Sequence, residues 1–256
     1  MKEIIRLIFT PIWKTWFMLC FAIPFLVLYP LFVLTIYTGN IRAAYGLKKV
    51  WAFLICLFAG IIPVITYKKK YEWPKVCVVA SNHTSYLDIC LSVFYMKHTA
   101  LFMAKIELMK APLFGLFFRG MDIPVNRKSK MGSHKAFVDA GHKIDEGYSM
   151  CIYPEGTISN EGVLRPFKNG AFKLAIEKQV PIIPVANLNN WRLLQNGGFF
   201  KRFGRPGVAR IVVGEPIETK GMTEENLVDL RSQVHDFIQA ELDKYTKGSK
   251  YDGTEN

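Results

Sequence analysis

The longest stretch without a charged residue most restricts what this chain can fold into. From Thr15 to Ile41 there are 27 consecutive uncharged positions, whereas about 20 apolar residues suffice for a helix to cross the hydrocarbon core of a bilayer. A signal peptide is excluded because the run is long, lacks a small-residue cleavage pattern and is followed by a second apolar segment. Pro24 and Pro30 interrupt the run, so we expect a kinked helix or two short helices.

The second apolar segment, Val50 to Tyr67, is uncharged for 18 residues and is closed by three lysines at positions 68–70. The two segments together predict a membrane-embedded helical hairpin over residues 1–75, which either spans the bilayer or dips into one leaflet. Lys and Arg favour the cytoplasmic side of a membrane, and both topologies place the N-terminus and the rest of the chain on the same side. We therefore expect the protein at the cytoplasmic (inner) membrane, with its remaining domain on the cytoplasmic side.

The charge of the chain favours a membrane surface as its partner. The net charge is +12, and residues 1–75 hold ten Lys and Arg against two acidic residues. Basic residues beside apolar segments attract anionic lipid headgroups, and motifs typical of nucleic-acid binding are absent from the sequence. We therefore expect membrane lipids as partners and no nucleic acid.

The cysteines are odd in number and scattered, mostly within apolar runs. This pattern is typical of small buried side chains in a reducing compartment rather than of a disulfide framework or a zinc site. No metal site is expected. The five residues are Cys20, Cys56, Cys77, Cys90 and Cys151.

Beyond residue 76, short apolar runs alternate with helical patterns, which predicts an α/β domain over residues 76–246 and a tail over 247–256. Its largely parallel mixed sheet should be flanked by helices, with functional groups at the carboxyl ends of the strands. The expected strands are Val76–Ala80, Leu101–Ala104, Ile123–Val125, Met150–Tyr153, Ile182–Val185 and Val208–Val213. The expected helices are Tyr86–Lys97, Leu108–Phe118, Ser133–Glu146, Asn169–Lys178 and Thr223–Tyr245, and 188–206 is expected as a loop.

The block from Asn82 to Asp88 combines a base and a carboxylate directly after the first of these strands. An imidazole can take a proton from a hydroxyl, and a carboxylate on its other nitrogen would fix the tautomer. Five positions on an ideal helix rotate by about 500°, so His83 and Asp88 can meet only if a helix begins between them. Ser85 supplies such a start as an N-cap residue. The alternative is a capping box beside an ordinary loop histidine.

A second segment has the same spacing. His134 and Asp139 are also five positions apart, but they lie inside a predicted helix, where their side chains diverge. The spacing is therefore weak evidence, and the surrounding structure must distinguish the two segments.

Two later strand ends carry further polar residues. Arg127 follows the strand 123–125, where its guanidinium could bind phosphate, although a solvated basic turn is the alternative. Glu155, Gly156 and Thr157 follow the strand 150–153. Glycine permits close approach of the backbone to a ligand, and the two polar side chains can bind hydroxyls. A tight turn at the strand exit is the alternative here.

Four blocks in order, from Asn82 to the apolar stretch Val180–Val185, resemble the lysophosphatidic acid acyltransferases, or 1-acyl-sn-glycerol-3-phosphate O-acyltransferases, as does the N-terminal hairpin. The resemblance implies transfer of a fatty acyl group from a thioester of acyl carrier protein or coenzyme A to the free hydroxyl of 1-acyl-glycerol-3-phosphate, giving phosphatidic acid in phospholipid biosynthesis. No other cofactor is implied. By this resemblance His83 is the general base and Asp88 orients it. The substrate-binding residues it implies are Lys105, Arg127, Glu155, Gly156 and Thr157.

One position departs from the family pattern, which usually has arginine where this chain has Ile158. Arg165 or Lys168 are the available substitutes. The departure leaves open another lyso-lipid acceptor, such as an amino-acid-containing lipid. A non-catalytic membrane scaffold of the same fold is the alternative from another class. A thioester is already activated, so direct attack by the acceptor is preferred over a covalent intermediate on Ser85 or Cys90.

Overall fold

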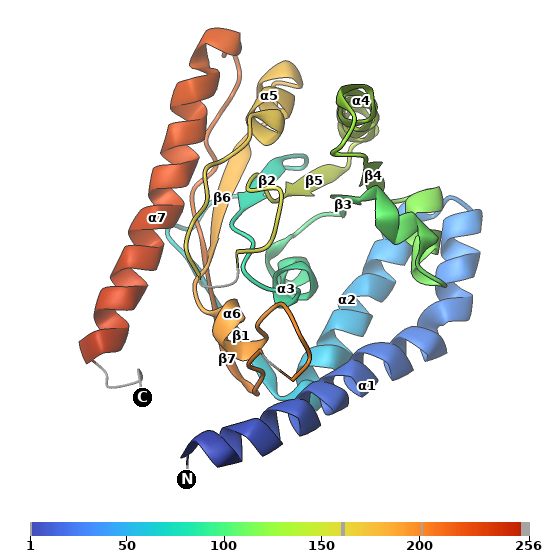
Figure 1. Ribbon diagram of the computed structural model, residues 1–256. Helices are drawn as coiled ribbons and strands as arrows, with labels where there is room; N and C mark the ends of the chain where they lie inside the picture. Colours follow the sequence, from blue (N-terminus) through green and yellow to red (C-terminus); the bar gives the residue numbers. More distant parts are fainter. Residues whose placement is uncertain (1, 160–161, 201, 252–256) are drawn as a thin grey trace.

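The computed structural model describes residues 2–159, 162–200 and 202–251. The chain begins with helix α1 (Lys2–Tyr37), which remains a single helix although Pro11, Pro24 and Pro30 lie within it. Helix α2 (Ile41–Ala59) runs back along α1 (Figure 1). The side chain of Asn40 accepts a hydrogen bond from the Ala43 N–H and so caps the start of α2.

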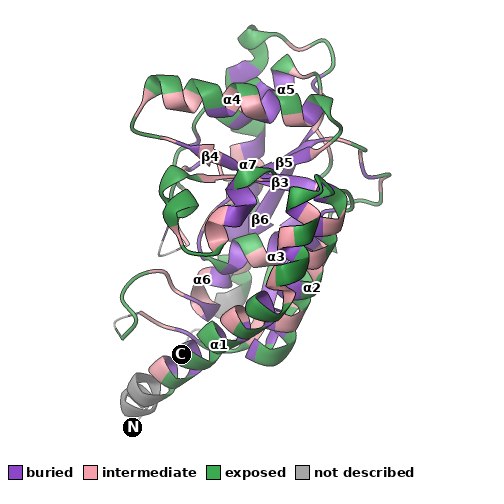
Figure 2. Ribbon diagram, turned by 90° about the vertical axis from the view of Figure 1, so that its right-hand side faces the viewer, coloured by how far each residue is buried: buried purple, intermediate pink, exposed green. Residues whose placement is uncertain are grey.

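Aromatic side chains join the two helices to each other. The Trp51 ring of α2 has its centroid 4.9 Å from that of Phe25 and 6.2 Å from that of Phe32, the latter in an edge-on arrangement. The opposite face of α1 is apolar and exposed (Figure 2). Among the described helices, only α1 is long and apolar enough to cross a membrane, over Phe9–Tyr37. This exposed face supports association of α1 with a membrane.

The segment Val50–Tyr67, expected as one helix, divides into a helix and a strand. Gly60 adopts a left-handed conformation with φ 69°, which ends α2. Strand β1 (Ile61–Tyr67) follows and pairs in parallel with β7 (Gly207–Val213). The β-branched residues of this segment suit a strand. The sheet therefore includes residues that the sequence assigned to the membrane hairpin.

Within the described residues, seven strands form one sheet in the order β1-β7-β6-β2-β5-β3-β4. All neighbours are parallel except β6 and β7, which are antiparallel. This confirms the predicted largely parallel mixed sheet. The remaining strands are β2 (Val78–Ser81), β3 (Ala100–Lys105), β4 (Ile123–Val125), β5 (Ser149–Ile152) and β6 (Ile182–Asn187).

Helices cover both faces of the sheet. Helices α4, α5 and α7 form one layer, and α2 and α3 lie on the other side (Figure 1). The helices of the α/β domain are α3 (Leu87–Tyr95), α4 (Lys130–Asp145), α5 (Gly170–Glu177), α6 (Asn190–Leu193) and α7 (Leu227–Tyr251), with the short 3-10 turn η3 (Glu224–Asn226) before α7. Helix α7 continues to residue 251, beyond the predicted end at Tyr245, and residues 252–256 of the predicted tail lie outside the described residues.

The helix expected over Leu108–Phe118 is wrong. Two 3-10 helices, η1 (Ile106–Lys110) and η2 (Phe114–Arg119), occupy this region. Pro112 lies between them and lacks the N–H that a continuous helix needs. Leu113 then has φ 64°, and the Phe114 N–H donates to Pro112 O at 2.6 Å, which forms a tight three-residue turn. Helix α6 was also not expected, because its residues lie in the stretch predicted to be a loop.

Candidate active site

The first turn of α3 brings the predicted base and carboxylate together. His83 lies in the loop between β2 and α3, and its Nδ1 is 2.9 Å from Asp88 Oδ2. The Asp88 side chain is fully buried, whereas 12% of the His83 side chain is exposed. Because the carboxylate accepts the proton of Nδ1–H, the lone pair remains on Nε2. This is the tautomer that a histidine base requires.

Four donors surround the Asp88 carboxylate. Oδ2 also accepts the backbone N–H groups of Thr84, at 2.6 Å, and Ser85, at 2.9 Å. Oδ1 accepts a hydrogen bond from Asn190 Nδ2 at 2.7 Å. These bonds compensate the burial of a charge and fix the orientation of the carboxylate toward the imidazole.

Ser85 and Cys90 are both unsuited to act as nucleophiles. The buried Ser85 hydroxyl donates to Leu194 O at 2.6 Å and accepts from the Leu87 N–H at 3.1 Å. The predicted capping box is thus half formed, since Asp88 bonds the Ser85 N–H but Ser85 caps Leu87. Burial raises the pKa of the Cys90 thiol to about 12, which keeps it protonated at neutral pH.

A network of buried amides supports the dyad from β6. Asn187 N–H donates to Asn82 Oδ1 at 2.7 Å, and Asn82 Nδ2 donates to Asn187 O at 3.0 Å. Asn190 Nδ2 lies 3.2 Å from Asn187 Oδ1 and bridges this network to Asp88. Sequence reasoning missed Asn187 and Asn190. An asparagine at the carboxyl end of a wholly apolar strand is the signal that could have identified Asn187.

The loop after β5 holds His83 from the other side. The Tyr153 ring stacks on the imidazole, with centroids 4.1 Å apart. The Glu155 Oε1 accepts the His83 N–H at 2.7 Å, and the Ser159 N–H donates to His83 O at 2.7 Å. The backbone of His83 is therefore bonded at both its donor and its acceptor.

Glu155 is oriented toward the protein rather than toward solvent. Its Oε2 accepts the Arg165 N–H at 3.1 Å, so both carboxyl oxygens bind backbone amides. Only 4% of the residue is exposed, and this burial raises the pKa of the carboxyl to about 7. Glu155 thus bonds the backbone of His83, and its expected role in binding a substrate hydroxyl stays a prediction.

Two cationic side chains converge on Gly156. Arg127 Nη1 donates a hydrogen bond to Gly156 O. On the other side, a Cβ built on Gly156 would lie 2.8 Å from Lys168 Nζ. Gly156 has φ 73°, a conformation that favours glycine. Of the two substitutes for the missing arginine at Ile158, Lys168 thus has its ammonium group beside Gly156.

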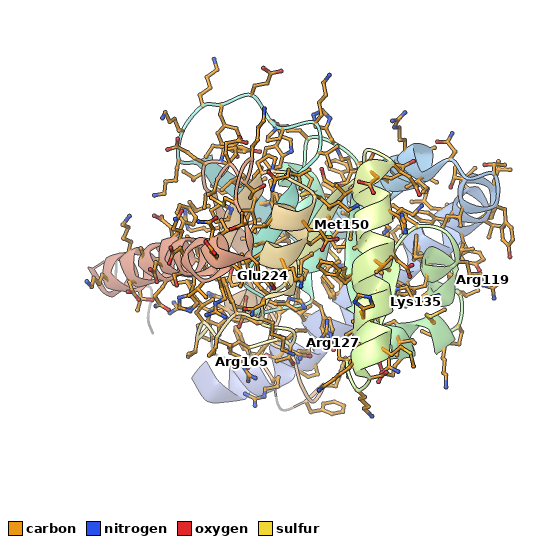
Figure 3. The ribbon with its side chains drawn as sticks, turned by 90° about the horizontal axis from the view of Figure 1, so that it is seen from above. Arg119, Arg127, Lys135, Met150, Arg165 and Glu224 are labelled. Atoms are coloured by element: carbon orange, nitrogen blue, oxygen red, sulfur yellow. The ribbon has the colours of Figure 1, made fainter. Side chains whose placement is uncertain are left out.

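The remaining predicted residues lie at the rim. Lys105 is exposed at the carboxyl end of β3, opposite Val125 in the register, and Thr157 is exposed in the loop after β5. In the described part of the chain, neither side chain bonds the other predicted site residues. The Arg165 side chain is exposed as well, and Figure 3 shows Arg127 and Arg165 at the same edge of the molecule. Within the described residues, no group of His, Cys, Asp or Glu is arranged to hold a metal ion.

The strand ends thus bring two chemical features together, and helix α1 adds a third. A histidine with a free Nε2 can accept a proton from a hydroxyl. Two cations beside Gly156 can bind a phosphate. The apolar face of α1 belongs to the same molecule and can keep it at a lipid surface.

The chain is similar to several known acyltransferases. The family model described as Acyltransferase matches residues 64–187. Human 1-acyl-sn-glycerol-3-phosphate acyltransferase beta is 31% identical over 180 residues, which are 70% of this chain and 64%, a little under two thirds, of the human protein. The 1-acyl-sn-glycerol-3-phosphate acyltransferase of Haemophilus influenzae is 28% identical over 206 residues, covering 73% of this chain and 80% of the relative.

Two further comparisons extend over most of both chains. The protein acl-2 of Caenorhabditis elegans is 31% identical over 202 residues, which are 76% of this chain and 69% of the relative. The crystal structure of the 1-acyl-sn-glycerophosphate (LPA) acyltransferase PlsC from Thermotoga maritima is similar in fold, with a TM-score of 0.77 and 23% identity, and the match covers 94% of this chain and 98% of that one. This chain belongs to the acyltransferase family that includes the 1-acyl-sn-glycerol-3-phosphate acyltransferases.

Proposed function

We propose that this protein transfers a fatty acyl group from a thioester to the free hydroxyl of 1-acyl-glycerol-3-phosphate and so forms phosphatidic acid. One observation carries the proposal. The loop after β5 bonds His83 of the His83–Asp88 pair, and the same loop has two cations beside Gly156. The names of the human and Haemophilus influenzae relatives support the same reaction.

The chemistry needs one base and no covalent intermediate. The acceptor hydroxyl attacks the thioester carbonyl while His83 Nε2 takes its proton, and Asp88 stabilises the imidazolium that forms. The tetrahedral intermediate then expels the thiolate, which recovers the proton from the imidazolium. A positioned base of this kind contributes about 10²- to 10⁴-fold to the rate.

The acceptor phosphate would lie against Arg127 and Lys168. The planar guanidinium can bind two phosphate oxygens at once, and the lysine adds a point charge. Lys168 thereby takes over the charge that Ile158 does not provide. Lys105 and Thr157 border this site and would contact the glycerol phosphate.

The donor would be a thioester of acyl carrier protein or coenzyme A, with no further cofactor. The support for a position at the cytoplasmic side of the inner membrane is the exposed apolar face of α1 together with its basic flanks. In this position the acceptor would enter from the bilayer and the donor from the cytoplasm.

The test is turnover with a panel of acceptors. The protein is purified in detergent and given a labelled acyl thioester with 1-acyl-glycerol-3-phosphate, a lysophospholipid with a substituted phosphate, or an amino-acid-containing lyso-lipid. We expect product with the first acceptor. A folded protein that acylates none of them would contradict the enzymatic activity, and turnover of only the phosphate-free acceptor would contradict the proposed substrate.

A further inference from the structure

A buried ion pair joins helix α2 to the segment that leads to Arg127. The Lys48 Nζ of α2 lies 2.5 Å from Asp122 Oδ2, and the two side chains are only 10% and 8% exposed. The Lys48 ammonium also lies over the rings of Phe102 and Phe117, at 5.2 and 4.8 Å from their centroids. Two opposite charges are thus held away from water between α2 and the sheet, where each compensates the other.

Asp122 fixes the start of strand β4. Its Oδ1 accepts the Phe102 N–H of β3 at 3.0 Å, and its own N–H donates to Phe117 O at 2.8 Å. The first pair of β3 with β4 is Met103 with Ile123, so Asp122 lies opposite Phe102 in the same register. The carboxylate therefore continues the pairing of the two strands by one hydrogen bond.

Strand β4 has few other contacts to hold it in the sheet. Among the described strands it pairs only with β3, and it is three residues long. Pro124, in its middle, has no N–H to donate. Only Asn126 separates the end of β4 from Arg127. A shift of β4 would therefore move the guanidinium that contacts Gly156.

The opposite face of α2 is apolar and exposed. Val50, Phe53 and Leu57 lie about 140° to 200° around the helix from Lys48, and all three are exposed. The turn that joins α1 to α2 lies beside the 3-10 helices η1 and η2 (Figure 1). Lys48 thus connects a helix that presents apolar side chains to its surroundings with the strand that leads to the cationic site.

We propose that Lys48 and Asp122 are positioning residues, which fix β4 from helix α2 and so place the Arg127 guanidinium for the acceptor phosphate. Neither residue would touch substrate, because both act through β4. The inference rests on the proposed function only in naming the acceptor phosphate as the group that Arg127 binds. Loss of the pair should weaken acceptor binding and leave the chemistry of His83 intact.

The first test measures hydrogen exchange of the full chain in detergent and needs no turnover. K48M/D122N removes both charges, so no unpaired charge stays buried, and it keeps an oxygen that can accept the Phe102 N–H. The amides of residues 123–127 should exchange at least about tenfold faster than in the parent, whereas those of β5 should not change.

The control for this test is K178M/D145N, which removes an ion pair of the same 2.5 Å length between the ends of α5 and α4. It should leave the exchange of residues 123–127 at the parent rate. Unchanged exchange of these residues in folded K48M/D122N would overturn the proposal. If K48M/D122N does not fold, K48M gives the same comparison, because Asp122 then keeps its bond to Phe102.

The second test separates positioning from simple stabilisation through the kinetics of the folded variants. K48M/D122N should raise KM for 1-acyl-glycerol-3-phosphate by about tenfold and keep kcat and the KM for the acyl thioester within about twofold of the parent. K48R retains the charge and should recover most of the acceptor affinity. A parent KM in K48M/D122N would overturn the proposal and leave the pair as a stabilising contact.

The combination with R127M tests the route of the effect. If the pair acts through Arg127, adding K48M/D122N to R127M should not raise the acceptor KM further. Effects that multiply would overturn the proposal. A parent that acylates no acceptor would contradict the proposed function, and hydrogen exchange would still decide whether the pair fixes β4.

Discussion

Two segments of this chain place a histidine and an aspartate five residues apart, but only one of them forms a pair. Helix α3 begins at Leu87, so His83 lies in the preceding loop and contacts Asp88 in the first turn. His134 and Asp139 both lie within α4, and no hydrogen bond or ion pair joins them. The comparison shows that the position of the helix start, rather than the spacing, creates the pair.

The surroundings of the two segments differ as much as their geometry. His134 is exposed on a surface helix. Asp88 is wholly buried and bonded by Asn190, while Glu155 and Tyr153 hold His83 from the loop after β5. The His83–Asp88 pair therefore depends on residues from segments far apart in sequence, and each of these supports can be removed separately.

The largest effect is expected from Asp88→Asn. An amide in place of the carboxylate presents a donor to groups that are themselves donors, and it no longer fixes the Nδ1–H tautomer of His83. We expect kcat to fall by about 10³- to 10⁴-fold at saturating substrates. The matched variant Asp139→Asn should retain the parent kcat. Comparable losses in both variants would show that the buried pair has no special role.

A smaller loss is expected from Asn190→Ala. This change removes one hydrogen bond to the Asp88 carboxylate, worth roughly 1.5–3 kcal/mol, so kcat should fall by about 10- to 100-fold. KM should stay unchanged, because Asn190 positions the dyad and does not touch substrate. Gln239→Ala removes a comparable bond, Gln239 Nε2 to Asp243 Oδ1 at 2.8 Å on the surface of α7, and serves as the control. A rise in KM with unchanged kcat would contradict the positioning role.

Lys168→Met tests the cationic side of the site. If Lys168 binds the acceptor phosphate, its loss should raise KM for 1-acyl-glycerol-3-phosphate by about tenfold, or roughly 1.4 kcal/mol of binding. The KM for the acyl thioester should not change. The control is Lys173→Met, which removes a lysine of α5 that pairs with Glu224. An unchanged KM for the acceptor would contradict phosphate binding by Lys168, and another residue would then have to replace the missing arginine.

The smallest effect on catalysis, but a distinct effect on stability, is expected from Glu155→Gln. Burial raises the pKa of this carboxyl from 4.5 to about 7, so the folded state binds the proton more tightly than the unfolded state. The resulting stability is fully present below about pH 4.5 and is lost as the pH rises through about 7. The glutamine of the variant carries no charge at any pH, so the variant does not lose this stability as the pH rises.

The measurement for Glu155→Gln is the free energy of unfolding in detergent across this pH range. Relative to the parent, the variant should gain on the order of 3 kcal/mol between about pH 4 and about pH 8. Glu146→Gln, at the exposed end of α4, is the control. A difference between variant and parent that does not change with pH would contradict the buried, proton-binding state of Glu155.

The sequence predicted the alternating part of the fold because strands and helices of an α/β domain leave local patterns. It failed at β1, since an uncharged run such as Val50–Tyr67 has the same hydropathy as a helix or as a buried strand. Only the pairing with β7, whose partner residues lie 146 positions later in the sequence, distinguishes a strand from a helix here. The helix expected at 108–118 failed because the effect of Pro112 outweighed the apolar pattern.

The site was predictable where its contacts are local and unpredictable where they are distant. His83 and Asp88 are only five residues apart, so the predicted N-cap at Ser85 was enough to indicate that their side chains could make contact. Asn190 reaches Asp88 across 102 residues, and Glu155 reaches the His83 N–H across 72. No local pattern encodes such contacts, which arise only when the strand ends meet at one edge of the sheet.

His83 can act as the base because helix α3 begins between it and Asp88, so that the two side chains meet. The most direct test is acyl transfer to 1-acyl-glycerol-3-phosphate by His83→Ala and His134→Ala, prepared alike and shown to unfold at the parent temperature. We predict that His83→Ala loses at least about 10²-fold in kcat and that His134→Ala retains the parent rate. An inactive His134→Ala, or a fully active His83→Ala, would contradict this claim.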